Sequence, residues 1–184
     1  MIKRIKPCEH HNRKIGLEKR TEFFFSPGYN VIIGPNQSGK STLLEALASC
    51  NYCEIEKTSD TKIKFISTET LSPLMMKKFK SREQVIMYTR ALFSSYGEIV
   101  QELLGAQGYL EENCIIIDTP ETGQDIENSF IIHEGFKKMA SKGIQVIIAT
   151  HHPVFLQDVN KVIEFKENYL KKFLELYNKS LITR

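Results

Sequence analysis

A glycine-rich stretch from Gly34 to Ser41, GPNQSGKS, constrains the fold more than any other feature, and it fits the pattern G-x-x-x-x-G-K-[ST]. The run Asn30 to Ile33 reads as a strand entering it, and Thr42 to Ser49 reads as a helix leaving it. A strand, a glycine-rich turn and a helix in this order let backbone N–H groups face phosphate oxygens, and the helix N-terminus adds its dipole. The sequence therefore predicts a phosphate-binding loop that holds a nucleoside triphosphate, which we expect to be ATP.

The residues expected to contact the nucleotide are contiguous along this loop. Lys40 is expected to reach the β- and γ-phosphates, and the Ser41 hydroxyl to ligate Mg²⁺. The full predicted nucleotide-binding set from this segment is Gly34, Pro35, Asn36, Gln37, Ser38, Gly39, Lys40, Ser41 and Thr42.

Two further apolar segments end in residues suited to phosphate chemistry. The segment Cys114 to Asp118 is a short buried strand that ends in an acid, the Walker B pattern that holds Mg²⁺. A second apolar strand, Val146 to Ala149, leads into Thr150-His151-His152-Pro153. We expect both to be central parallel strands.

The remaining pattern predicts an α/β domain with a central, mostly parallel sheet and an antiparallel β part. Alternation in Glu54–Lys57 and Lys62–Ser67, with a turn between them, predicts an antiparallel hairpin. Other strands are expected at 2–7, 21–25 and 162–165, and helices at 82–104, 126–141 and 168–180.

Length and composition favour one compact domain over 1–184. Hydrophobic residues make up 41% and charged residues 26% of the 184, and the net charge is +3. No apolar run approaches the roughly 20 residues that span a bilayer, and the first residues lack the apolar stretch of a signal peptide. We therefore expect a cytoplasmic protein without membrane insertion, with its four cysteines as reduced thiols.

Taken in order, GPNQSGKSTLLEAL, IIIDTPE and ATHHP resemble the Walker A, Walker B and switch-histidine segments of ATP-binding-cassette (ABC) ATPases. The resemblance points to the soluble branch of structural-maintenance-of-chromosomes (SMC) and overcoming-lysogenisation-defect-like ATPases, of the AAA_21 type. It covers about residues 2–165. Ser94-Ser95-Tyr96-Gly97-Glu98 resembles the family's signature motif, within a small helical subdomain at about 71–108. This would be a minimal, stand-alone head.

The resemblance implies an ATPase that releases ADP and phosphate from an ATP-sandwiched homodimer. Lys40, Ser41 and Asp118 would bind nucleotide and Mg²⁺, and His151 would contact the γ-phosphate and the attacking water. Ser95 and Gly97 would act on the nucleotide of the opposite subunit. Asp125 would lie near the subunit interface, and Arg13 and Lys14 in an early loop beside the nucleotide.

Two positions depart from the family pattern. Thr119 stands where many members carry a catalytic glutamate, and threonine is no general base at neutral pH. Glu121 is the expected substitute and Glu98 a second candidate. No glutamine occurs between Cys50 and Thr70 for a Q-loop, and Glu69 would have to serve. An ATP-gated dimerisation switch with negligible hydrolysis and a transporter ATPase subunit therefore stay open as alternatives.

Three further patterns each have a simple structural interpretation. Cys8, His11, Cys50 and Cys53 could form a zinc site, although one C-x-x-C is a weak signal and ordinary thiols are favoured. Lys77–Arg82, with Lys3, Arg4 and Lys6, could contact nucleic acid, although short charge runs are mostly solvated faces. The last helix carries an apolar stripe that we expect to pack on the sheet, formed by Leu170, Phe173, Leu174, Tyr177 and Leu181.

Overall fold

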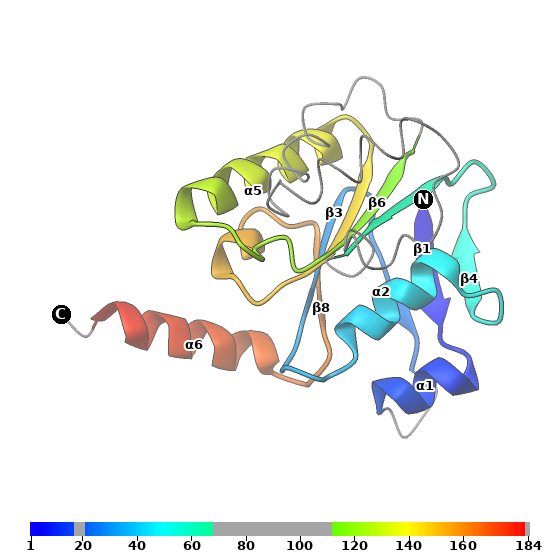
Figure 1. The fold of residues 1–184 in the computed structure, drawn as a ribbon, viewed down its shortest axis with the longest axis horizontal. Helices are drawn as coiled ribbons and strands as arrows, with labels where there is room; N and C mark the ends of the chain where they lie inside the picture. The colour runs from blue at the N-terminus through cyan, green and yellow to red at the C-terminus, as the bar shows by residue number, and fades with distance from the viewer. Residues whose placement is uncertain (17–20, 68–111, 183–184) are drawn as a thin grey trace.

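The computed structural model describes residues 1–16, 21–67 and 112–182, and contains a five-stranded and a three-stranded sheet (Figure 1). The predicted helix at 82–104, the signature motif and the helical subdomain at 71–108 lie outside the described residues. The predicted α/β class, with a parallel sheet and an antiparallel part, is confirmed.

The larger sheet is parallel throughout, in the order β5-β6-β7-β3-β8. Its strands are β3 (Tyr29–Ile33), β5 (Ile63–Ile66), β6 (Cys114–Asp118), β7 (Gln145–Ala149) and β8 (Lys161–Glu164). The three central strands are almost continuously apolar because both faces of the sheet are covered. Alternate residues pack against α2 (Lys40–Ser49) on one face and against α5 (Ile126–Ser141) and the 3-10 turn η2 (Pro153–Leu156) on the other.

The smaller sheet is antiparallel, in the order β2-β1-β4, and consists of β1 (Ile2–Lys6), β2 (Phe23–Phe24) and β4 (Glu54–Lys57). Opposite charges line its exposed face. Arg4 pairs with Glu22 at 2.9 Å and with Glu56 at 3.6 Å, and Lys6 pairs with Glu54 at 3.8 Å.

The predicted hairpin between the segments 54–57 and 62–67 is wrong. β4 pairs with β1, whose basic residues complement its glutamates, while β5 pairs in parallel with β6 in the other sheet. A turn at Thr58 and Thr61 carries the chain between the two sheets, and the N-terminal amine of Met1 donates to both threonine hydroxyls. Pairing with β1, about 50 residues earlier in the chain, thus replaces the expected local hairpin.

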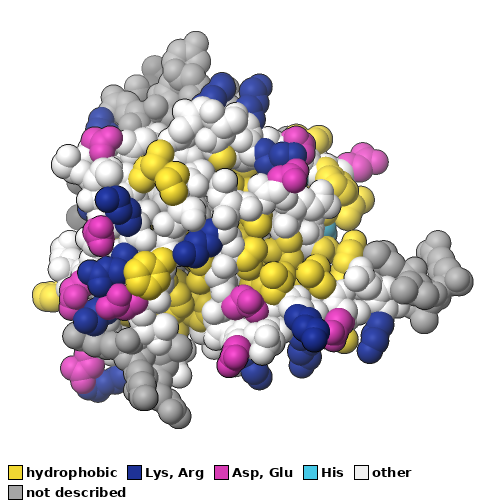
Figure 2. Space-filling view, turned by 180° about the vertical axis from the view of Figure 1, so that it is seen from behind, with side chains coloured by type: hydrophobic (Ala, Val, Ile, Leu, Met, Phe, Trp, Pro, Cys, Tyr) yellow, Lys and Arg dark blue, Asp and Glu magenta, His cyan; other side chains and the backbone are white. Residues whose placement is uncertain are grey.

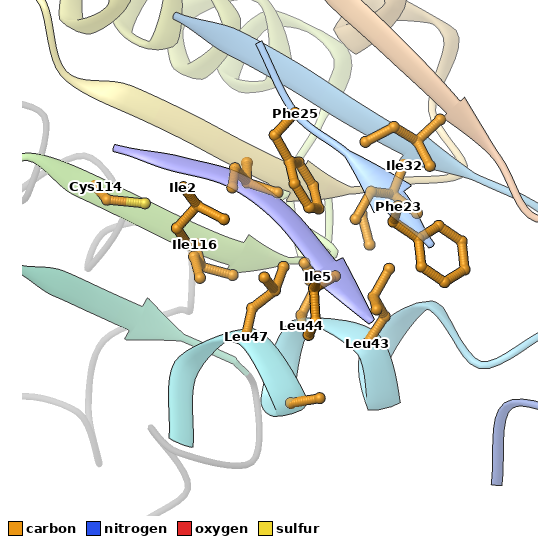
Figure 3. Packing of buried hydrophobic residues seen from close by; sticks show 14 of the residues in the cluster. Ile2, Ile5, Phe23, Phe25, Ile32, Leu43, Leu44, Leu47, Cys114 and Ile116 are labelled. Carbon is orange, nitrogen blue, oxygen red and sulfur yellow. The ribbon is translucent and has the colours of Figure 1, made fainter. Parts of the chain in front are cut away.

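The two sheets share one core with α2. Figure 3 shows Ile5 of β1 facing Leu43, Leu44 and Leu47 of α2, with Ile116 of β6 nearby. The buried side chain of Gln145 also joins the sheets, because its amide accepts from Ile2 N at 2.7 Å and donates to Ile2 O at 2.7 Å. These contacts fix the phosphate-loop helix against both sheets.

Two terminal segments differ from expectation. Arg13 and Lys14, expected in an early loop, lie in a short helix, α1 (Glu9–Ile15), whose only buried residue is Ile15. The last helix, α6 (Tyr169–Ile182), forms as expected but projects from the body (Figure 1).

The apolar stripe of α6 does not pack on the sheet as expected. Only its first turn, at Tyr169 and Leu170, packs against the core, whereas Leu174 is 40% and Tyr177 36% exposed. Figure 2 shows apolar side chains gathered on the face beside this helix. Among the described residues, no helix has both the length and the apolar composition needed to cross a membrane.

Candidate functional site

The glycine-rich segment forms the connection between the end of β3 and the start of α2, as its pattern predicts. Gly39 caps α2 with φ of 94°, a backbone conformation that residues with a Cβ atom adopt at a cost. A Cβ at Gly39 would also lie 2.8 Å from the Ile15 Cα, and one at Gly34 would lie 2.8 Å from the Phe165 Cβ. Both glycines are therefore required by close packing, which fixes the loop between α1 and β8.

The side chain of Lys40 lies on the concave side of this loop, and the residue is only 5% exposed. Its Nζ donates to the carbonyl oxygens of Gly34 at 3.1 Å and of Pro35 at 2.8 Å. Burial lowers the pKa of Lys40 from its usual value, and the carboxylates of Asp118 and Glu121 partly oppose this shift. The loop thus presents a fixed cation where phosphate oxygens would enter.

The ends of β3, β6 and β7 bring the acid and the histidine to the same edge of the sheet. β7 lies between β6 and β3, and the carboxyl ends of parallel strands form the ligand-binding edge of such sheets. The N–H of Thr119 donates to Ala149 O at 2.9 Å, and that of Thr150 donates to Ile32 O at 3.2 Å. The strand order therefore places motifs more than 100 residues apart around one space.

That space is a cavity of about 410 Å³. It is lined by the phosphate loop and by the residues after β6 and β7, together with one residue of α1: Lys14, Asn36, Gln37, Ser38, Gly39, Lys40, Ser41, Thr42, Asp118, Thr119 and His151. A cavity of about 440 Å³ opens at the other end of β3, beside Gly28 and Asn160, and it lacks the loop and the strand-end acid. The smaller cavity is therefore the candidate site.

Glu121 does not line this cavity but supports its wall. Its Oε2 accepts from the Thr150 hydroxyl at 2.8 Å and its Oε1 accepts from the N–H of His151 at 2.7 Å. The Thr150 hydroxyl also accepts from the N–H of His152 at 2.9 Å. One carboxylate thus joins the segment after β6 to the segment after β7, directly beside His151.

Thr119 has an unusual backbone conformation, with φ of 48°. A β-branched residue in this region is strained, and such strain is concentrated at functional sites. Its side chain lines the cavity next to Asp118. The position of the usual catalytic glutamate is therefore part of the cavity wall here, without a carboxylate.

His151 lies half-buried at the cavity. Burial is the main cause that lowers its pKa from the usual value, and the cation of Lys40 adds to the effect, while Glu121 and Asp118 oppose it. A histidine with a lowered pKa stays neutral at pH 7 and can both donate and accept a hydrogen bond.

The structure brings residues 36–42, Asp118 and His151 together around the cavity, with Glu121 behind them. The predicted residues Gly34 and Pro35 do not line it, and their carbonyl oxygens accept from Lys40 Nζ. Lys14, which the resemblance placed beside the nucleotide, lines the cavity, but it lies on helix α1 and not in a loop. The role of Thr150 was less evident, because its place before His151 was its only signal in the sequence. Ser95, Gly97, Glu98 and Glu69 lie outside the described residues.

Three other residues or groups from the sequence analysis have structural partners. Asp125 caps α5, where its carboxylate accepts from Asn128 N at 2.7 Å. Arg13 forms an ion pair with Glu9. Lys3, Arg4 and Lys6 pair with glutamates of the antiparallel sheet, so these three cations already have anionic neighbours within the chain.

Comparison with known proteins identifies the family of the chain. A family model described as an AAA domain, AAA_23, matches residues 11–182. The chain belongs to this family. A DNA replication and repair protein RecF from Streptococcus equi subsp. zooepidemicus (strain MGCS10565) is 24% identical over an alignment of 173 positions, and the match covers 86% of this chain and 44% of RecF. The chain thus spans less than half the length of the curated relatives it matches.

Solved structures share the fold at low identity. The SMC head domain from Thermotoga maritima has a TM-score of 0.58 at 13% identity, covering 89% of this chain and 94% of that one. A dimeric post-hydrolysis state of the ATP-binding cassette MJ0796, bound to ADP and Pi, has a TM-score of 0.57 at 20% identity, covering 80% and 85%. The resemblance to ABC-class, SMC-like P-loop ATPases is confirmed at the level of the fold. The matching family model makes this an AAA_23 domain, where the AAA_21 type was expected.

Proposed function

We propose that this AAA_23 domain binds ATP with Mg²⁺ and hydrolyses it to ADP and phosphate between two copies of the chain. The observation that carries the proposal is the cavity of about 410 Å³ in which the glycine-rich loop, Lys40, Asp118 and His151 meet. A nucleoside triphosphate needs inward-facing N–H groups, a cation and a metal-binding acid in one place. The family and the fold point to the same chemistry.

The side chains that would hold Mg²⁺ are Ser41 and Asp118. Both line the cavity, and a hydroxyl and a carboxylate supply the oxygen ligands that this hard cation prefers. Bound there with the nucleotide, the ion would neutralise charge that develops on the phosphate oxygens. Lys40 would leave its two carbonyl partners for the β- and γ-phosphates, whose negative charge would offset the cost of burying this cation.

Hydrolysis requires water to attack the γ-phosphorus while the bond from that phosphorus to the β–γ bridging oxygen breaks. The oxygen of the water forms a new bond to the γ-phosphorus, which leaves as phosphate. The electrons of the broken bond stay on the oxygen of ADP, and the attacking water gives up a proton. We assign orientation of the water and the γ-phosphate to neutral His151. We assign the proton to Glu121, whose carboxylate keeps further lone pairs beyond the two that accept from Thr150 and His151.

In the proposed dimer, the opposite copy supplies further groups to the nucleotide. The MJ0796 cassette is described as a dimer with ADP and Pi, and it shares this fold. We propose that Ser95 and Gly97 of the opposite copy complete the site from across the nucleotide. ATP binding would then close the dimer, and phosphate release would open it.

Asp118→Asn tests the metal assignment. We expect it to reduce Mg²⁺-dependent phosphate release by at least about 100-fold, because it removes a charge that holds the ion beside the phosphates. Asp158→Asn is the matched control, since Asp158 lies beside the other cavity and pairs with Lys137 at 2.9 Å. Equal turnover of Asp118→Asn and wild type would refute the assignment.

One alternative has structural support: an ATP-gated dimerisation switch with negligible hydrolysis. Thr119 provides no base, and Glu121 already accepts two hydrogen bonds. This alternative predicts stable ATP-dependent dimers that release no phosphate. Size-exclusion chromatography with ATP, followed by analysis of the nucleotide in every fraction, separates the two: ADP and free phosphate together with loss of the dimer support hydrolysis, and a lasting dimer with intact ATP supports the switch.

We further propose that the ATPase serves nucleic-acid maintenance or defence, which rests on the name of the RecF relatives. If so, double-stranded DNA should raise the rate of phosphate release at low salt, and added salt should reduce the effect. An unchanged rate over a range of DNA concentrations and lengths would count against this setting and leave the ATPase proposal intact.

A further inference from the structure

A cluster of three cysteines and one histidine lies away from the nucleotide cavity, where two turns of the chain meet. Cys8 caps the start of α1 and His11 is in that helix, while Cys50 caps the end of α2 and Cys53 directly precedes β4. β1 and β4 pair with Lys6 opposite Glu54. This register brings Cys8 and Cys53 together although they are 45 positions apart in the sequence.

The four side chains point at one another. The Cys8 Sγ lies 3.1 Å from the His11 Nδ1 and 4.0 Å from the Cys50 Sγ, and the Cys53 Sγ lies 3.8 Å from the His11 Nδ1. All four potential ligand atoms lie within 4.8 Å of one another. With metal–sulfur bonds of about 2.3 Å and metal–nitrogen bonds of about 2.0 Å, a tetrahedral zinc site has ligand–ligand edges of about 3.5–3.8 Å.

The same atoms are too far apart for a disulfide, which needs sulfur atoms about 2.05 Å apart. All four cysteines of the chain are free thiols. Cys114, the fourth, is buried in β6 and belongs to the hydrophobic core instead. The cluster is therefore a distinct set of three thiols and one imidazole.

Backbone donors also face two of the sulfurs. The N–H of Cys8 donates to the Cys53 Sγ at 3.3 Å, and the N–H of Tyr52 donates to the Cys50 Sγ at 3.4 Å. Such N–H groups stabilise negative charge on sulfur and orient the ligands of a metal centre. The surrounding loops thus supply hydrogen-bond donors that would stabilise thiolates at this position.

We propose that Cys8, His11, Cys50 and Cys53 bind one zinc ion in a closed, structural Cys₃His site. Zinc fits the ligand set because thiolate and imidazole suit it in tetrahedral geometry, whereas Mg²⁺ and Ca²⁺ prefer oxygen. Four protein ligands leave no position for a substrate, so the site holds structure and performs no reaction.

The zinc ion would tie the start of α1 to the end of α2. The other end of α1 packs on the phosphate loop, where Ile15 lies within 3 Å of the place a Cβ of Gly39 would take. Lys14, one residue earlier, lines the nucleotide cavity. α1 has only one buried apolar residue, so a metal link at its start would supply much of what holds it in place.

Metal analysis of the whole protein tests the proposal. We expect protein purified from zinc-supplied medium without chelators to contain about one zinc per chain by inductively coupled plasma mass spectrometry. After removal of the metal, added Co²⁺ should give the strong visible bands of tetrahedral cobalt and the near-ultraviolet band of thiolate ligation. Removal should also lower the melting temperature by about 5–15 °C, reversibly on return of zinc.

Paired variants locate the ligands. Cys53→Ala and His11→Ala should bind Co²⁺ at least about tenfold more weakly, or not at all. Cys114→Ala and His10→Ala are the matched controls, since Cys114 is in the core and His10 is an exposed neighbour outside the cluster; both should keep the metal. Circular dichroism of each variant distinguishes metal loss from unfolding.

Several results would overturn the proposal. Wild-type protein with far less than one zinc per chain and a colourless response to Co²⁺ would show that these are ordinary thiols. A mass decrease corresponding to loss of two hydrogens, without bound metal, would show a disulfide instead. Metal retained equally by Cys53→Ala and Cys114→Ala would place the ion elsewhere. None of these measurements depends on ATP hydrolysis.

Discussion

At the scale of single residues, the position of Glu121 matters most for the proposed chemistry. Its two carboxylate oxygens accept from the Thr150 hydroxyl and from the N–H of His151, and this fixes the histidine segment against the strand that carries Asp118. The carboxylate thus has a structural task whether or not it also receives a proton. A substitution that keeps its shape but removes its charge can separate the two tasks.

Glu121→Gln is that substitution. Its amide can accept from His151 N and donate to the Thr150 hydroxyl, so both contacts can persist. If Glu121 takes the proton of the attacking water, phosphate release should fall at least about 100-fold while the ATP dissociation constant changes little. Single-turnover hydrolysis and equilibrium binding of a fluorescent ATP analogue measure the two quantities.

Thr150→Val is the comparison for this variant. It removes one hydrogen bond to Glu121 but keeps the charge, so we expect a much smaller loss of turnover. Equal losses in Glu121→Gln and Thr150→Val, or full activity in Glu121→Gln, would show that Glu121 only positions the histidine segment.

At the scale of elements, the packing of α1 on the phosphate loop determines the shape of the cavity. Gly39→Ala would place a Cβ 2.8 Å from the backbone of Ile15 at φ of 94°. We expect it to cost about 3 kcal/mol of unfolding free energy and to weaken ATP binding, since both clash and backbone strain oppose it. Urea unfolding and ATP titration measure these effects.

Gly143→Ala is the control for backbone strain alone. Gly143 has φ of 85° with open space around its Cβ position, and it lies in the turn between α5 and β7. We expect a cost of about 1–2 kcal/mol and unchanged ATP affinity. If the two variants lose equal stability, the contact between Ile15 and Gly39 is unimportant for the loop.

The elements also show what the sequence could predict. β3, β6, β7 and α5 were predicted within one or two residues, because buried parallel strands are apolar throughout and α5 has a regular apolar face. The pairing of β4 could not be predicted from its own residues, because its partner strand, β1, lies about 50 positions earlier in the chain. β1 also carries the cations that form ion pairs with the glutamates of β4.

The two ends of α1 show why this helix and part of the site were missed. Cys8 gives no side-chain cap, and the residues from His10 to Lys14 have no apolar period, so the sequence carries little signal for this helix. Its contacts with the phosphate loop and with the Cys50 region depend on the folded structure. The loop residues, Asp118 and His151 were predictable because their motifs end successive strands. The hydrogen bonds of Glu121 depend on the order of β6 and β7 in the sheet.

At the scale of the whole molecule, the chain contains the cavity but depends on a partner copy for the proposed reaction. Its relatives named RecF are more than twice as long as the matched region, whereas its fold covers 85% of the MJ0796 cassette and 94% of the SMC head. We therefore expect two such heads to close on ATP.

The shared site can be tested by measuring phosphate release from ATP and Mg²⁺ over a series of protein concentrations. Light scattering on the same samples gives the oligomeric state. A site shared between two chains predicts that activity per chain rises with concentration and levels off as ATP-dependent dimers form. Activity per chain that stays constant while the ATP-bound protein remains monomeric would contradict the shared site. Dimers that form with ATP but release no phosphate would contradict hydrolysis.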